Sequence, residues 1–206
     1  MFQTNLSGTF EIIKSLMDFF GQGLVLVYPS VIVFWIIFHS KIERLRGVGR
    51  RAYWVALLAW ALLGFPLLYY HEAVFAVRWP MPWWLKTVGV AVTGLALWIG
   101  RQAYRVIPTR TLIGLPELQP QENVQPLLQT GIYQRTRNPV YLTHILLLVS
   151  AVCFTGYLAN AVLLAFDAVC LPWMIRAEER ELRQRYGFDY ADYMARVPRL
   201  FPKLFR

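Results

Sequence analysis

Two arginines lie close together just before a long apolar run, and their positive charges could bind an anionic or zwitterionic ligand. The segment 130–141 (TGIYQRTRNPVY) holds Arg135 and Arg137 just before a long apolar run. Gly131 permits a tight turn, and Pro139 suits the first turn of a helix because it has no N–H to leave unpaired. Such a junction at the edge of a membrane can hold an anionic or zwitterionic ligand.

Two adjacent carboxylates, Glu178 and Glu179, follow the last apolar run by roughly one turn of helix. They are expected at the membrane level at which Arg137 enters the preceding helix. A carboxylate at this level can hydrogen-bond the amine or hydroxyl groups of a ligand, or it can pair with an arginine of the connector. The residues alone leave the ligand-binding role and the structural role open.

The elements that must position these residues are membrane-spanning helices. Of the 206 residues, 57% are hydrophobic and only 16% are charged, and the mean hydropathy is +0.40. This composition is too apolar for an ordinary soluble domain. It predicts an all-α, polytopic membrane helical bundle that forms one domain over residues 1–206. About five spans are expected, over residues 19–40, 52–70, 83–100, 139–155 and 159–175.

Local patterns add detail to this topology. Residues 1–18 mix polar and apolar positions, which indicates a short helix at the membrane interface. Residues 138–175 are too long for one span, so the turn residues at 155–160 predict a hairpin of two short spans. Small residues on the third span are expected to let helices approach closely: Gly89, Gly94 and Gly100.

The excess of basic residues sets the expected orientation. The formal net charge is +9, and the basic residues cluster between apolar runs, as topology signals do. Segments 41–51, 101–138 and 176–206 are therefore expected in the cytoplasm, with the N-terminus outside. Nucleic-acid binding is not expected, because no basic and aromatic domain stands clear of the spans. No metal site is expected either, because Cys153 and Cys170 lie in apolar runs without metal-ligand spacing.

The charged tail has its own helical patterns. Glu179 with Arg183, and Glu181 with Arg185, have the i,i+4 spacing of ion pairs on one helix. Asp189 is predicted to N-cap a second short helix. An aromatic stripe is expected on one face of this second helix, formed by Tyr186, Tyr190 and Tyr193.

Taken together and in order, the motifs of the C-terminal half resemble those of the isoprenylcysteine carboxyl methyltransferase and phospholipid methyltransferase family of integral-membrane enzymes. The N-terminal spans match this family only in hydropathy. The motifs are Gly131-x-Tyr133-x-x-x-Arg137-Asn138-Pro139-x-Tyr141, Glu178-Glu179-x-x-Leu182, Tyr186-Gly187-x-x-Tyr190-x-x-Tyr193 and Val197-Pro198-Arg199-x-x-Pro202.

The resemblance implies S-adenosylmethionine as methyl donor, with S-adenosylhomocysteine as product, in a pocket built from residues 101–141 and 176–206. Consistent with this, no G-x-G-x-x-G follows a strand pattern anywhere in the chain. Where enzymes acting on prenylcysteine have His, this chain has Asn138, which excludes proton transfer by a histidine there but not a backbone contact to the cofactor. The implied cofactor-binding residues are Gly131, Tyr133, Arg137, Asn138, Pro139, Tyr141, Glu178 and Glu179.

Arg101 and Glu178 are the catalytic candidates. In the prenylcysteine enzymes an arginine at the membrane end of the third span handles the substrate carboxylate, and Arg101 matches it best, with Arg105 one turn further on. An arginine at the edge of a low-dielectric cavity can orient an anion bidentately, although snorkelling explains Arg101 nearly as well. Asp167 and His144 are ionisable groups within apolar runs, to which the resemblance assigns no role.

The expected function is methyl transfer to a lipophilic acceptor that enters from the membrane lipids, most like carboxyl O-methylation of isoprenylcysteine. The alternative is N-methylation of a phospholipid, whose amine must lose a proton to Glu178, Glu179, Asp167 or His144. A small thiol is a third possible acceptor. A non-catalytic membrane protein or a membrane reductase on the same architecture also stays open.

Overall fold

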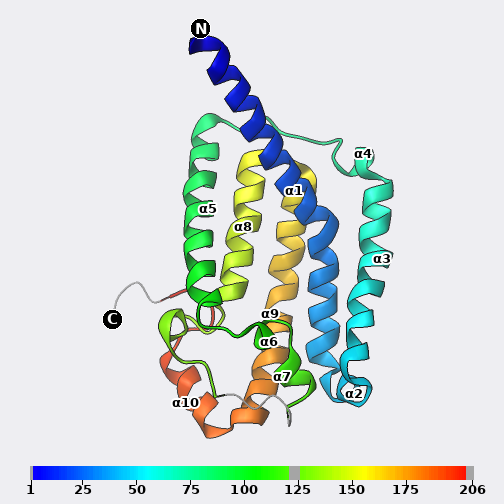
Figure 1. The fold of residues 1–206 in the computed structure, drawn as a ribbon, viewed down its shortest axis with the longest axis vertical. Coiled ribbons are helices and arrows are strands. Elements are labelled where there is room, and N and C mark those ends of the chain that lie inside the picture. Colours follow the sequence, from blue (N-terminus) through cyan, green and yellow to red (C-terminus); the bar gives the residue numbers. More distant parts are fainter. Residues whose placement is uncertain (1, 121–125, 203–206) are drawn as a thin grey trace.

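The computed structural model describes residues 2–120 and 126–202, so residues 121–125 and 203–206 of the predicted cofactor region lie outside the described residues. The expected all-α bundle is confirmed (Figure 1). Within the described residues, extended backbone pairs only at an isolated bridge between Arg78 and Tyr157. The five long helices are α1 (Phe2–Ser40), α3 (Trp54–Tyr69), α5 (Trp83–Tyr104), α8 (Pro139–Thr155) and α9 (Leu158–Tyr186).

Short elements lie at the two ends of the bundle. At the end where α9 terminates, the lower end in Figure 1, are α2 (Ile42–Val48), η1 (Gly49–Tyr53), α6 (Thr109–Leu112), α7 (Leu115–Leu118), η2 (Gly131–Gln134) and α10 (Phe188–Arg196). At the other end are α4 (His71–Val74) and the turn between α8 and α9. We call the first the cavity end and the second the opposite end.

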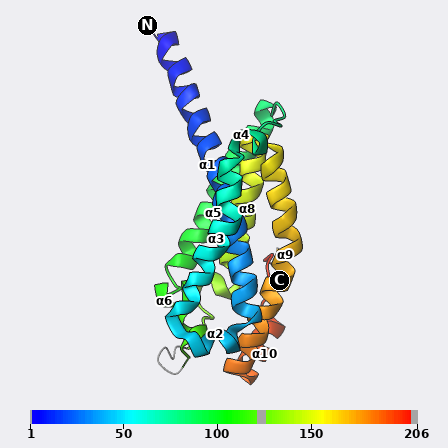
Figure 2. The same ribbon diagram turned by 90° about the vertical axis from the view of Figure 1, so that its right-hand side faces the viewer.

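α1 is one helix of 39 residues, so the prediction of a separate interfacial helix over residues 1–18 is wrong. Its first turns run on from the span and project beyond the bundle (Figures 1 and 2). Gly21 does not break the helix, because one glycine weakens a helix by only about 1 kcal/mol. Here it permits a close approach, since a Cβ on Gly21 would lie 2.6 Å from Cγ2 of Thr155.

α8 and α9 form the predicted hairpin. α8 ends at Thr155, and Gly156 takes a φ of 68° before α9 begins. Glycine is required there, because a Cβ would collide with the carbonyl oxygen of Trp79. Arg78 ties the turn to α1, since it donates to the Thr155 carbonyl at 2.7 Å and pairs with Asp18 at 2.7 Å.

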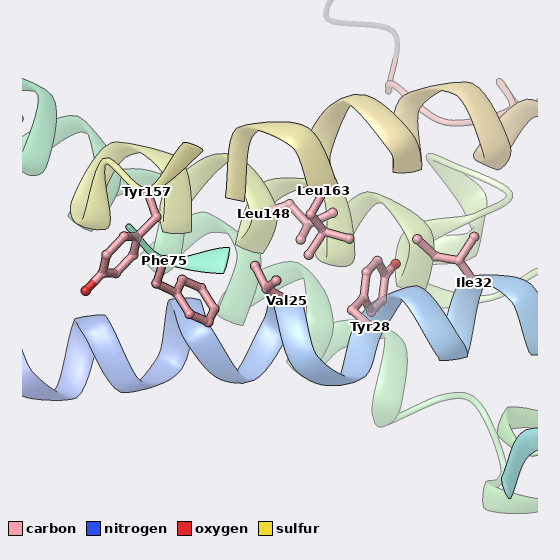
Figure 3. Packing of buried hydrophobic residues seen from close by; sticks show 7 residues of the cluster. All are labelled: Val25, Tyr28, Ile32, Phe75, Leu148, Tyr157 and Leu163. Carbon is pink, nitrogen blue, oxygen red and sulfur yellow. The ribbon is translucent and has the colours of Figure 1, made fainter. Parts of the chain in front are cut away.

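The core between α1, α8 and α9 is apolar. Val25, Tyr28 and Ile32 of α1 pack against Leu148 of α8 and Leu163 of α9 (Figure 3). In a bilayer the lipid chains are as apolar as these side chains, so close packing stabilises such an interface more than exclusion of water does.

α5 packs against α8 through two of the three predicted glycines. A Cβ on Gly89 would lie 3.1 Å from Cβ of Cys153, and a Cβ on Gly100 would lie 3.2 Å from Cγ2 of Thr143. Gly94 faces open space, so the prediction of a packing role is wrong for this residue. Positions eleven residues apart, about three turns, share one face of a helix, and Gly94 lies on another face.

Length and composition allow four of the described helical segments to cross a membrane, and α8, with 17 residues, is apolar but shorter. The four are Glu11–Ser40, Ile42–Tyr69, Trp83–Tyr104 and Leu158–Tyr186. Together with α8 they match the five predicted spans. In α9 we take residues 158–175 as the membrane-spanning part, because the charged residues begin at Arg176.

Candidate functional site

A cavity of about 160 Å³ lies at the cavity end, where the connector, the segment 130–141 and the charged part of α9 meet. We call the residues that line it the cavity wall. The wall is mostly apolar and aromatic, with a few ionisable groups, as is typical of small-molecule sites. Its ionisable groups include His39, Glu117, Arg137, Tyr141, Glu178 and Arg185.

Gly131 shapes the entry to α8 without lining the cavity. It takes a φ of 60°, the left-handed region that favours glycine, and it begins η2. Tyr133, two residues later, is buried and belongs to the cavity wall. Its carbonyl oxygen accepts a hydrogen bond from the Tyr193 hydroxyl at 2.6 Å, which joins η2 to α10.

The turn before α8 is held by the tail. The Thr136 hydroxyl donates to the carbonyl of Leu200 at 2.7 Å, and the Asn138 amide donates to the carbonyl of Arg199 at 2.8 Å. Asn138 and Pro139 both belong to the cavity wall, and Pro139 is the first residue of α8, as predicted. The Asn138 side chain therefore fixes the tail against this wall.

Glu179 lies in a buried ion cluster behind the wall. Arg137 donates to one carboxylate oxygen of Glu179 through Nε at 3.1 Å and Nη2 at 2.6 Å, and through Nη1 to the carbonyls of Met194 and Val197. Arg199 pairs with the other carboxylate oxygen at 2.8 Å. Glu179 therefore pairs with these two arginines, and its side chain is only 4% exposed.

Glu178, the preceding residue, belongs to the cavity wall. Its Oε2 accepts a hydrogen bond from the Tyr141 hydroxyl at 2.7 Å, and Nε2 of His39 lies 3.9 Å from the same oxygen. The side chain keeps 25% of its surface accessible, because it faces the cavity. Burial raises the pKa of the Glu178 carboxyl from 4.5 to about 7, although the hydrogen bond from Tyr141 opposes this shift.

A second ion cluster borders the cavity. Arg185 pairs with Glu181 at 2.6 Å, as predicted, and with Glu117 of α7 at 3.4 Å, while Arg46 of α2 pairs with Glu181 at 3.0 Å. Burial raises the pKa of the Glu117 carboxyl, and the nearby charge of Arg185 opposes the rise. Oε2 of Glu117 is buried without a hydrogen-bond partner in the described part of the chain.

Three ionisable wall residues lie outside the predicted set. An ionisable residue inside an apolar run is a functional candidate, and this criterion identifies Asp167 and His144. His39 also lies inside an apolar run, so the same criterion would have identified it. Arg185 is predicted only as a helical partner of Glu181. Nothing in the sequence marks Glu117, because the connector has no periodic pattern that separates buried from exposed positions.

Arg101 and Arg105 are exposed at the end of α5 and lie outside the cavity wall. The structure therefore brings Glu178 to the cavity but not Arg101. His144 belongs to the wall. Asp167 is 1% exposed on α9, and its carboxylate makes no hydrogen bond of normal geometry within residues 2–120 and 126–202.

Tyr186, Tyr190 and Tyr193 all belong to the wall. The prediction that they share one face of the second helix is wrong for Tyr186, which is the last residue of α9. α10 follows Gly187, which has a φ of 54° and is the N-cap. The prediction of Asp189 as N-cap is therefore wrong, and this residue lies in the first turn of the helix.

The wall suits an organic cation that carries an aromatic ring. It offers the Glu178 carboxylate to a positive charge. It also holds aromatic rings, of Tyr133 and of the three tyrosines at the end of α9 and in α10, on which a flat ring could stack. Among the residues that the structure describes, no group of three or more His, Cys, Asp or Glu side chains could hold a metal ion.

Comparison with family models matches residues 84–189 to phospholipid methyltransferase. No curated protein matches the chain. The family match runs from α5 into α10 and includes Arg137, Glu178 and Glu179, whereas α1, with its share of the cavity wall, lies outside it. Since one family model covers just over half of the sequence, and its residues build most of the cavity, the chain belongs to the phospholipid methyltransferase family of integral-membrane methyltransferases.

Proposed function

We propose that the protein transfers a methyl group from S-adenosylmethionine to a lipophilic acceptor that enters from the bilayer. Membership of a family of membrane methyltransferases supports the reaction class. The observation that carries the proposal is the meeting of the turn at Arg137 and the carboxylate of Glu178 on one cavity, although they are far apart in the sequence.

The residues of the wall fit S-adenosylmethionine. We expect Glu178, held by Tyr141, to bind its ammonium or ribose hydroxyls, and Tyr133 to stack on its adenine. Asn138 and Pro139 are expected to contact it through their backbone. The cofactor, when bound, supplies an electrophilic methyl group.

Gly131 and Arg137 act mainly on the shape of the wall. Gly131 sets the turn that leads to Tyr133, and Arg137 is fixed by Glu179 and by carbonyl oxygens of the tail. A sulfonium loses its charge when it gives up a methyl group, so the chain needs no nucleophile of its own. Its residues are expected to align donor and acceptor within the cavity.

The charges of the wall favour an amine as the acceptor. Arg137 is engaged by Glu179, and Arg185 is engaged by Glu181 and Glu117, so neither arginine is free to receive a carboxylate. Glu178 offers a negative charge to an incoming ammonium. N-methylation of an amine lipid is therefore the acceptor chemistry that these contacts favour.

Carboxyl O-methylation is the second candidate, because the motifs of the C-terminal half resemble those of enzymes with this activity. In that case Arg101 would orient the carboxylate from the membrane edge of α5. Its exposure leaves it free for such a contact, although it lies outside the cavity wall.

We also propose that the cavity end faces the cytoplasm and that the N-terminus lies outside. α2 and η1 carry Arg44, Arg46, Arg50 and Arg51 at the cavity end, and the charged part of α9 is there too. Basic segments of this kind are retained on the cytoplasmic side. A water-soluble donor would then enter from the cytoplasm, and the lipophilic acceptor from the side.

Transfer of a labelled methyl group to a lipid extract tests this function. The purified protein in detergent is expected to label a lipid, and the label is expected to resist mild alkali, because N-methyl groups do so and methyl esters do not. Release of the label by alkali would favour carboxyl methylation. Labelling no greater than that by Glu178→Gln would contradict the proposal.

A further inference from the structure

α1 brings a histidine to the cavity wall from outside the region that matches the family. His39 lies in the last turn of α1 and is 7% exposed. Its ring stacks on Trp35 with the ring centroids 5.2 Å apart and the planes at 20°, and Phe38 packs edge-on against it. These contacts fix the plane of the imidazole at the wall.

The hydrogen-bonding capacity of this ring is not used by the protein. Nδ1 is buried and has no hydrogen-bond partner in the described part of the chain. Nε2 is 3.9 Å from Oε2 of Glu178, which is too long for a direct hydrogen bond. An unmet buried polar atom destabilises the fold, so packing alone gives no reason for a histidine here. The gap suits a third group that donates to both the ring and the carboxylate.

We propose that Nε2 of His39 accepts the proton of an amine acceptor, whose ammonium hydrogen-bonds Oε2 of Glu178 in this gap while the other oxygen of that carboxylate binds the cofactor. The inference rests on the proposed N-methylation of an amine lipid and names the residue that takes the proton of that amine. The nitrogen first gives a proton to the imidazole. Its lone pair then forms the bond to the methyl carbon, the carbon–sulfur bond breaks, and sulfur keeps that electron pair. The imidazolium afterwards releases the proton to water.

Neighbouring ionisable groups from α8 and α9 have contacts of their own within the protein. From α9 Arg185 is bound by Glu117 and Glu181, and from α8 Tyr141 donates to Glu178. His144, also from α8, packs edge-on against Tyr28 with the ring centroids 5.4 Å apart. His39 belongs to the wall and places its Nε2 3.9 Å from the Glu178 carboxylate, at a distance that leaves both atoms able to bind the amine.

The test compares His39→Gln with His71→Gln, a matched control at the opposite end, where His71 lies 3.3 Å from Gln22. Methyl transfer to phosphatidylethanolamine is measured across pH, and binding of S-adenosylhomocysteine is measured by thermal shift. His39→Gln is expected to bind S-adenosylhomocysteine like the wild type but to lose about a hundredfold in kcat near neutral pH. The rate should recover towards about pH 10, where a primary amine loses its proton to water. His71→Gln should match the wild type throughout.

Three outcomes would overturn the role of His39. One is a wild-type rate for His39→Gln at neutral pH, another is a loss that alkaline pH does not relieve, and the third is a wild type that binds S-adenosylhomocysteine but methylates no amine. Failure of the proposed function looks different, because then the wild type neither binds S-adenosylhomocysteine nor methylates any acceptor. If His39→Gln does not fold, His39→Asn provides the same comparison.

Discussion

Two polar groups at the cavity end differ in how completely the protein satisfies them. The carboxylate of Glu179 is paired with Arg137 and Arg199 and lies behind the wall, and we call these three residues the closed group. The carboxylate of Glu178 receives one hydrogen bond, from Tyr141, and faces the cavity, and we call these two residues the open group. Adjacent residues on a helix point about 100° apart, so a pair of glutamates in one motif can divide into a structural residue and a ligand-binding residue.

The largest effect is expected when the closed group is broken. Arg137→Ala removes two contacts to a buried carboxylate, and removal of one partner of a buried ion pair typically costs about 3–5 kcal/mol. The melting temperature of the protein in detergent should therefore fall sharply. Glu178→Ala is the comparison and should fall much less. If Arg137→Ala and the wild type had the same melting temperature, Glu179 and its arginines would not be the structural group that we describe.

A smaller, pH-dependent effect is expected at the open group. Since burial raises the pKa of Glu178 from 4.5 to about 7, the folded protein binds more protons than the unfolded chain between these values. The free energy of unfolding should therefore decrease as pH rises through this range, and Glu178→Gln should lack this decrease. Without ligand, Glu178→Gln is expected to gain melting temperature relative to the wild type between about pH 4 and pH 8. A difference that does not change with pH would contradict the raised pKa.

The smallest effect is expected outside both groups. Arg101 is exposed and off the cavity wall, so Arg101→Gln should leave S-adenosylhomocysteine affinity and methylation of an amine lipid within about twofold of the wild type, as is usual for surface substitutions. A large rise in KM for a carboxylate acceptor, with the affinity for S-adenosylhomocysteine unchanged, would instead assign Arg101 the role that the sequence resemblance predicts.

Much of the fold follows from the sequence, because hydropathy predicts which segments cross the membrane and turn residues predict where the chain reverses direction. The hairpin at Gly156 is an example, since glycine alone fits the left-handed turn against Trp79. The continuity of α1 is not predictable in this way. Mixed polarity over residues 1–18 suggests a separate element, but no proline interrupts the chain before Pro29, so the helix runs on from this stretch into the span.

The site is predictable as a meeting of two segments but not in its details. The motifs identify Arg137, Glu178 and Glu179 together, and the rotation of α9 decides which carboxylate faces the cavity. His39 and Glu117 come from α1 and the connector, which join the wall only through tertiary packing. Sequence spacing carries no information about such contacts.

Calorimetric titration of S-adenosylhomocysteine into the detergent-solubilised protein tests the central claim most directly, because the claim is that the cavity beside Glu178 binds the nucleoside. The wild type is expected to bind. Glu178→Gln should bind tens- to a hundredfold more weakly, the loss expected for a hydrogen bond to a charged group of about 1.5–3 kcal/mol, while it stays folded. Wild-type affinity in a folded Glu178→Gln would contradict the account.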